Sequence, residues 1–262
     1  MNNNNPITGR NMFIWRLGPV LKVEMGIYNF IRKVKRAKLS SIWIKIAVGT
    51  SPYSRNIDDN LLIIRDKLND AGISVWGYHE PRCKAEEIAV NEAEIVATLA
   101  NELKLKGIIM DAEKPEGNYF FQGGEKEANA YAKRLRQLCD ELGLGLAICS
   151  HDIPQNFPDF PFESFAEHAH VNASQVYYGS SNSVRNRLER AINANSMLTI
   201  PFIPVGSGWV GGGGGCSSAS ACAERAIVFM QLVRENGFPG YSFWHWAGAP
   251  LALWEVLFEN PV

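Results

Sequence analysis

Two carboxylates close a short apolar run at residues 107–113, GIIMDAE. Side chains alternate along a β-strand, so Ile109, Asp111 and Glu113 are predicted to share one face. If that face is buried, loss of water and like charge raise the pKa of one carboxyl group and leave a protonated acid beside an ionised one. General-acid cleavage of a glycosidic bond needs such a pair. The alternative is that the two carboxylates only cap a loop or pair with Lys114.

Short β-branched or aromatic runs alternate with longer amphipathic segments along the whole chain, and these elements must position the pair. Eight runs are predicted as strands, beginning at residues 12, 41, 73, 107, 144, 173, 198 and 241. Each is followed by a predicted helix, over 20–38, 58–72, 85–106, 125–143, 162–169, 183–196, 220–237 and 250–260. Eight βα units are the number that closes a (β/α)₈ TIM barrel, the predicted α/β fold. A doubly wound sheet is the competing fold, but the glycine-rich turn expected after its first strand is missing.

Composition limits the partners and the compartment. No linker divides the chain, so we predict a disordered or loosely packed tail at residues 1–10 and one barrel domain over 11–262. A net charge of −1 gives no reason to expect nucleic acid, and no apolar stretch is long enough to span a membrane. Five scattered cysteines favour a reduced compartment. Without a signal peptide, the protein is expected in the cytoplasm as synthesised, to be released by lysis or carried on a phage-type particle.

Barrel sites form at the carboxyl ends of the strands, and the polar and aromatic residues at those ends are the candidates for substrate binding. Flat aromatic rings bind the C–H faces of sugars, and polar groups fix their orientation. Tyr53 and Arg55 are expected on the surface instead. The substrate-binding candidates are Arg16, Trp76, Tyr78, His79, Glu80, His151, Gln175, Tyr178, Trp209, Trp244 and Trp246.

The pattern G-x-x-x-D-x-E, formed by Gly107, Asp111 and Glu113, resembles the fourth-strand motif of chitinase-type (family 18) glycoside hydrolases. The D-x-E also resembles that of the family-25 barrel lysozymes. The resemblance implies Glu113 as general acid and Asp111 as the residue that orients the substrate's own N-acetyl group, which acts as nucleophile. It also implies a tyrosine from the sixth strand, and we predict Asp111, Glu113 and Tyr177 as the catalytic set. Tyr177 or Tyr178 would hold the acetamido group together with Gln175.

The sequence departs from these families at several positions. Lys106 and Ile109 stand where the chitinase motif carries further acids, and Gly179 follows Tyr178 where an acid is usual. Arg16 stands where the family-25 lysozymes carry an aspartate. The predicted function is cleavage of an N-acetylhexosamine-containing polysaccharide of the peptidoglycan or chitin type. A catalytically silent barrel, which binds glycan or forms part of a larger assembly, is the alternative.

A metal-dependent hydrolase is a further alternative, and no cofactor is predicted. His79, His151 and His245 could meet the two carboxylates at one barrel end, although the first strand lacks the H-x-H of an amidohydrolase. The glycine-rich segment 208–218, GWVGGGGGCSS, lacks the G-K-[ST] of a phosphate-binding loop. We predict that it is a mobile flap over the substrate, with Trp209 in contact.

Overall fold

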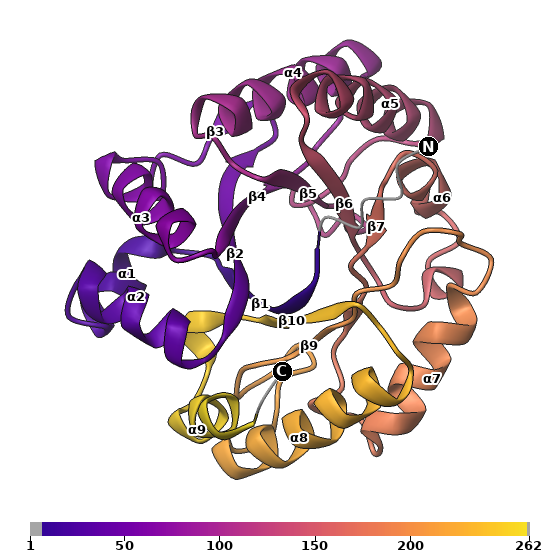
Figure 1. Ribbon diagram of the computed structural model, residues 1–262. Helices are drawn as coiled ribbons and strands as arrows, with labels where there is room; N and C mark the ends of the chain where they lie inside the picture. The colour runs from indigo at the N-terminus through magenta and orange to yellow at the C-terminus, as the bar shows by residue number, and fades with distance from the viewer. Residues whose placement is uncertain (1–6, 261–262) are drawn as a thin grey trace.

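The computed structural model describes residues 7–260, whose parallel strands form a ring surrounded by helices (Figure 1). The strands follow one another around the ring in the order β7-β6-β5-β4-β2-β1-β10-β9-β8. Because β7 (Val171–Asn172) and β8 (Gln175–Val176) are two parts of one stretch of chain, this order closes on itself. The other ring strands are β1 (Gly9–Ile14), β2 (Leu39–Val48), β4 (Ser74–Glu80), β5 (Gly107–Asp111), β6 (Gly145–Cys149), β9 (Val205–Ser207) and β10 (Gly240–Trp244). The predicted (β/α)₈ barrel is confirmed.

The helices pack around the outside of the ring. The segment predicted as one helix over 20–38 forms two, α1 (Leu17–Val23) and α2 (Ile27–Arg36). Met25 and Gly26 separate them with positive φ angles of 54° and 108°. The others are α3 (Asp59–Asp70), α4 (Glu86–Glu102), α5 (Glu125–Leu142), α6 (Phe162–Ala166), α7 (Val184–Ala194), α8 (Ala219–Glu235) and α9 (Leu251–Glu259).

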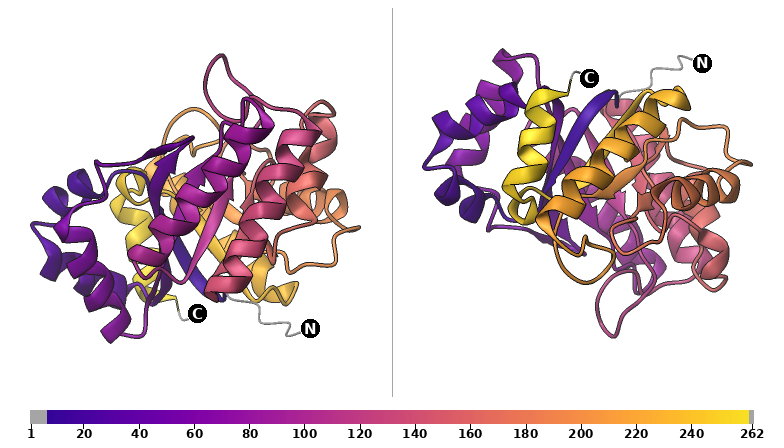
Figure 2. Two further views of the ribbon diagram at one scale, coloured as in Figure 1. Left: turned by 90° about the horizontal axis from the view of Figure 1, so that it is seen from above. Right: turned by 90° about the horizontal axis from the view of Figure 1, so that it is seen from below.

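Aromatic side chains fill the interior of the ring. The ring of Phe13 lies 4.7 Å from that of Trp43 and 5.3 Å from that of Tyr78, both in edge-to-face contact. Trp76 and Ile109 are buried in the same cluster. A barrel packed in this way has no pore, so a binding site must lie at one of its ends. We call the end at which the parallel strands finish the mouth, and the side views in Figure 2 show the segment after β5 projecting well beyond one end of the barrel.

The chain enters the barrel earlier than predicted. The predicted tail at residues 1–10 is wrong for residues 7–10, because Ile7 is buried inside the ring and Arg10 is fully buried outside it. Arg10 Nη1 donates hydrogen bonds to the carbonyl oxygens of Ala37 and Leu257, each at 2.6 Å. Arg10 therefore joins the ends of α2 and α9, and residues 1–6 lie outside the described residues.

Two strands are shorter than predicted. The run that begins at residue 198 contains Pro201 and Pro204, which have no backbone N–H to donate, and regular pairing starts only at Val205. In the stretch that holds β7 and β8, pairing moves from β6 on one side to β9 on the other. Within residues 7–260, none of the helices has the length and apolarity needed to cross a membrane.

Candidate active site

The two carboxylates meet one amide at the mouth. Asp111 ends β5 and is buried, and Glu113 follows two residues later, half-buried. Nε2 of Gln175, which begins β8, donates a hydrogen bond to Glu113 Oε1 at 2.8 Å and lies 3.4 Å from Asp111 Oδ1. The shared face predicted for Asp111 and Glu113 therefore points into the mouth, and Gln175 bridges the pair from across the ring.

Burial raises the pKa of both carboxyl groups. For Asp111 the loss of water is the largest cause, followed by the negative charge of Glu113, while the Lys45 ammonium opposes the shift. For Glu113 burial again comes first, and the hydrogen bond from Gln175 lowers its pKa in part. The pair therefore keeps a proton at pH values at which exposed carboxyl groups have lost theirs, as a general acid must.

A cavity of about 850 Å³ opens over this pair. Its volume lies in the range of pockets that hold small ligands. The predicted site residues that line it are Arg16, Tyr78, Glu80, Asp111, Glu113, Gln175, Tyr177, Trp209 and Trp244. Residues from the ends of β1, β4, β5, β8, β9 and β10 thus come together as the barrel topology predicts.

Aromatic rings form part of the cavity wall. Tyr177 packs edge-to-face against Trp209 with centroids 5.0 Å apart. Trp244 lies 5.2 Å from Phe13 and 6.2 Å from Tyr78. The Tyr78 hydroxyl is buried and has no hydrogen-bond partner among the described residues, so it is free to bond to a ligand. The wall can therefore offer both stacking surfaces and a hydroxyl to a sugar.

Sequence reasoning missed several residues of the cavity, above all the cations Lys45 and Arg82. Lys45 faces inward because it lies two residues after the interior Trp43 on the same face of β2, and its Nζ lies 2.7 Å from Glu80 Oε2. Arg82 Nη2 lies 2.8 Å from Glu80 Oε1. The signal was present, since Lys45 is the one charged residue in the apolar run 41–48. Trp15, Val48, Tyr119, Phe120 and Gly213 also line the cavity without having been predicted.

Tyr53 and Arg55 line the cavity as well, where a surface position was expected. The two-residue strand β3 (Ser51–Pro52) pairs antiparallel with the end of β2, with Pro52 opposite Ala47. The Tyr53 amide donates to the Ile46 carbonyl at 2.7 Å. This hairpin brings the following loop to the mouth.

Two predicted residues of β4 do not reach the cavity. Trp76 is buried within the ring, in the interior cluster. His79 points to the outer side of the sheet, where Nδ1 lies 2.7 Å from Tyr131 Oη and Nε2 lies 3.0 Å from the Gly49 carbonyl oxygen. Burial lowers the pKa of His79 to about 4. Both residues are structural parts of the barrel, which corrects their assignment to substrate binding.

Three further candidates also lie away from the cavity. Tyr178 packs on the outer side of the barrel, 5.0 Å from Phe229. Trp246 follows the end of β10 in a 3₁₀ turn and packs against Phe30 and Trp254. His151 Nε2 accepts a hydrogen bond from the Lys114 amide at 3.1 Å, and its ring lies 4.0 Å from that of Phe157. The assignment of Tyr178 and Trp246 to substrate binding is therefore corrected, whereas His151 pairs with Gln175 beside the mouth and its role stays a prediction.

The glycine-rich loop is held by hydrogen bonds. The Gly214 carbonyl accepts from the Gly179 amide at 3.0 Å and from Ser207 Oγ at 2.8 Å. Trp209 Nε1 donates to the Gly212 carbonyl at 3.0 Å. Gly214 has a φ of 90°, a conformation that L side chains rarely adopt. The loop thus forms a wall of the cavity, and its mobility stays a prediction.

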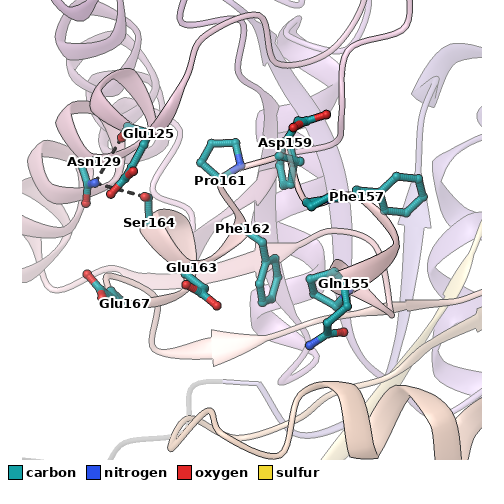
Figure 3. A pocket seen from close by; sticks show the side chains of 13 residues that line it. Glu125, Asn129, Gln155, Phe157, Asp159, Pro161, Phe162, Glu163, Ser164 and Glu167 are labelled. Atoms are coloured by element: carbon teal, nitrogen blue, oxygen red, sulfur yellow. Dashed lines mark hydrogen bonds between the residues drawn. The ribbon is translucent and has the colours of Figure 1, made fainter.

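A second cavity, of about 590 Å³, lies between α5 and the proline-rich segment before α6 (Figure 3). Its carboxylates, Glu125, Asp159, Glu163 and Glu167, are all exposed to solvent. Asn129 Nδ2 donates to the Glu125 carbonyl and to Ser164 Oγ, each at 3.1 Å (Figure 3). We interpret this surface as a solvated acidic face without the buried, interacting groups of the mouth.

The metal-dependent alternative required histidines and carboxylates to converge. His79 points away from the mouth, and His151 bonds to the Lys114 amide. Among the side chains described for residues 7–260, no three histidines, cysteines, aspartates or glutamates are arranged to hold a metal ion. The described residues therefore do not show the convergence that this alternative requires.

No protein-family model matches the sequence, and no curated protein matches it either. Solved structures do match the fold over nearly the whole chain. The Bacillus cereus spore cortex-lytic enzyme SleL matches with a TM-score of 0.69 at 11% identity, covering 97% of this chain and 75% of that one. The catalytic domain of a family 18 chitinase from the fern Peteris ryukyuensis matches with a TM-score of 0.67 at 14% identity, covering 95% and 96%.

A plant class V chitinase mutant from Cycas revoluta, solved in complex with (GlcNAc)3, matches with a TM-score of 0.66 at 11% identity, covering 95% and 98%. This protein is thus a (β/α)₈ barrel whose fold is similar to that of these glycoside hydrolases. More particularly, its barrel has the fold of the family 18 chitinases and SleL. The predicted resemblance is confirmed for the fold, and at these identities the likeness shows the fold alone.

Proposed function

We propose that this barrel is a glycoside hydrolase that cleaves an N-acetylhexosamine-containing polysaccharide of the peptidoglycan or chitin type. The observation that carries the proposal is the placement of Asp111 and Glu113 at the floor of an aromatic cavity, bridged by the Gln175 amide. The fold shared with chitinases and with SleL supports the same class of reaction.

In this proposal Glu113 donates a proton to the oxygen of the scissile bond. It is the more accessible of the two carboxyl groups, and burial keeps its pKa raised. Asp111 lies deeper and would orient the N-acetyl group of the substrate, which acts as nucleophile and displaces the leaving sugar. Tyr177 and Gln175 would hold that acetamido group. The bond between the N-acetyl oxygen and the anomeric carbon closes a ring, which is the intermediate. A water molecule then attacks the anomeric carbon and opens this ring, and the ionised Glu113 regains its proton from that water.

The test is the Glu113→Gln variant, assayed for product release from chitin oligosaccharides and from purified peptidoglycan. General-acid catalysis contributes about 10²- to 10⁴-fold to a rate, so a loss of at least about 100-fold is expected, with an unchanged circular-dichroism spectrum. Glu163→Gln, at an exposed position of α6 that does not line this cavity, is the matched control and should keep the full rate. An unchanged rate in Glu113→Gln would remove the assignment.

A catalytically silent glycan-binding barrel is the second candidate. Lys106 and Ile109, in place of further acids on β5, favour it. Calorimetry and product release measured on the same glycans separate the two candidates. Binding without products supports the silent barrel, whereas products that disappear with Glu113→Gln support the hydrolase.

A further inference from the structure

The mouth carries its positive charge on one half. Arg16 follows β1, Lys45 lies in β2, Arg55 follows the β2–β3 hairpin and Arg82 follows β4. Strands β1, β2 and β4 are neighbours in the ring, and all four side chains line the same cavity. The whole chain, by contrast, has a net charge of −1.

Among the described residues that line the cavity, one carboxylate offsets these cations on their own half. Glu80 pairs with both Lys45 and Arg82, at 2.7 Å and 2.8 Å. Arg16 and Arg55 are exposed and form no ion pair with any described residue. The Arg16 guanidinium lies only over the ring of Trp15, 4.3 Å from its centroid. This half of the mouth therefore holds two cations that no described residue pairs with.

The opposite half does not neutralise them fully. Even with Asp111 and Glu113 both ionised, the residues that line the cavity carry four cationic side chains against three carboxylates. Burial raises the pKa of both Asp111 and Glu113, which favours their protonated forms further. The exposed carboxylates of the second cavity line a different surface, beside α5 and α6. Positive potential therefore reaches solvent at the mouth, where a ligand enters.

A second observation points to an oxygen-bearing ligand on the same half. The Tyr78 hydroxyl is buried, lines this cavity and has no hydrogen-bond partner among the described residues. Lys45 Nζ lies 6.0 Å from the centroid of the Tyr78 ring. A buried hydroxyl without a partner is rare in a folded protein, and an acceptor on the ligand would satisfy it.

We infer that the glycan bound at this mouth carries carboxylate groups, which Arg16 and Arg55 recognise, so that an acidic N-acetylhexosamine polymer is preferred over a neutral one. This inference rests on the proposed function and narrows its substrate class. A guanidinium matches a carboxylate with two parallel hydrogen bonds, whereas a neutral sugar gains little from two uncompensated arginines. Arg16 and Arg55 are then residues that determine specificity, and they take no part in the proton transfer.

The experiment measures binding to one glycan in two charge states. The probe is a soluble fragment of peptidoglycan glycan strands, freed of peptides, compared with the same fragment after its carboxyl groups are converted to methyl esters. Calorimetry is performed on Glu113→Gln, so that cleavage does not interfere. We expect the carboxylate form to bind about tenfold more tightly at low ionic strength, and the difference to shrink as salt is added.

The double variant Arg16→Gln/Arg55→Gln should bind the carboxylate form about tenfold more weakly and the ester form unchanged. Arg16→Lys/Arg55→Lys keeps the charge and should recover part of the affinity. The control Arg32→Gln/Lys35→Gln makes the same charge change on the exposed face of α2 and should leave binding unchanged. Circular dichroism shows whether each variant is folded.

Equal affinities for the two forms, no binding of either, or an equal loss in the α2 control would each overturn the inference. Its failure remains distinct from failure of the proposed function. An unchanged rate of product release in Glu113→Gln refutes the proposed role of Glu113, and a wild type that releases no products refutes the hydrolase, whatever the charge preference. A missing charge preference refutes only the narrowed substrate class.

Discussion

Replacing Asp111 by asparagine is expected to stabilise the protein while removing its proposed activity. Gln175 Nε2 lies 3.4 Å from Asp111 Oδ1 and 2.8 Å from Glu113 Oε1, so these two oxygens are at most 6.2 Å apart. Two unit charges about 6 Å apart repel by about 3 kcal/mol at an effective dielectric constant of about 20. Asparagine keeps the shape of the side chain and can still accept the Gln175 hydrogen bond. The variant loses the repulsion and the cost of burying one charge, as happens when a strained site is relaxed.

The gain in stability should grow with pH. The pKa of Asp111 is raised from its ordinary 3.8 and that of Glu113 from 4.5. A carboxyl group whose pKa is raised by folding binds its proton more tightly in the folded state. Its contribution is fully present below the unfolded pKa and is lost as pH rises through the folded pKa. The wild type suffers this loss at two groups and Asp111→Asn at one, so the curves should coincide near pH 4 and diverge above it.

Urea unfolding from pH 4 to pH 9 measures this divergence. We expect the free energy of unfolding of Asp111→Asn to exceed that of the wild type by about 2 kcal/mol at pH 8, which allows for partial protonation of the pair. Each kcal/mol corresponds to about 2–4 °C in Tm for a chain of this size. Asp159→Asn, in an exposed loop, makes the same chemical change and should give no such trend. A difference that stays constant with pH, or a variant less stable throughout, would refute the reasoning.

Tyr177→Phe should lower kcat/KM about tenfold, because Tyr177 lines the cavity and its hydroxyl is proposed to hold the acetamido group. Tyr178→Phe should change kcat/KM less than about twofold, because its hydroxyl is buried on the outer side of the barrel. Burial lowers the pKa of His79 to about 4, so stability should fall as pH drops from 6.5 towards 4, and an NMR titration midpoint near 6.5 for this imidazole would contradict the structure. Phe13→Ala, inside the ring, should reduce the free energy of unfolding by about 3–5 kcal/mol in urea, against less than about 0.5 kcal/mol for the exposed Tyr28→Ala.

Strand periodicity predicts much of this site where the strand is regular. The rule that placed Asp111 and Glu113 on one face also separates Tyr78 and Glu80, which line the cavity, from His79, which points outward. The rule fails for Trp246, because β10 ends at Trp244 and the chain then enters a 3₁₀ turn.

Other features depend on contacts that no local pattern encodes. Arg55 reaches the mouth through the short pairing of β3 with the end of β2, and two residues of strand give no periodic signal. The choice between Tyr177 and Tyr178 also remained open in the sequence. Each face of their strand pairs a polar residue with a tyrosine, Gln175 with Tyr177 and Ser174 with Tyr178, and only closure of the ring between β6 and β9 decides which face points inward.

The charge balance of the site comes from strands other than β5. Ile109 lies below Asp111 on the same face, in the packed interior, where the resembling family carries an acid. Because Ile109 carries no charge, burial is the largest cause of the raised pKa of Asp111. The positive charge that opposes this shift comes from another strand. Lys45 supplies it from β2, and Glu80 from β4 holds Lys45 in place. A barrel can therefore keep a carboxylate pair at its mouth while the residues that tune it move to neighbouring strands, since side chains from all strands converge there.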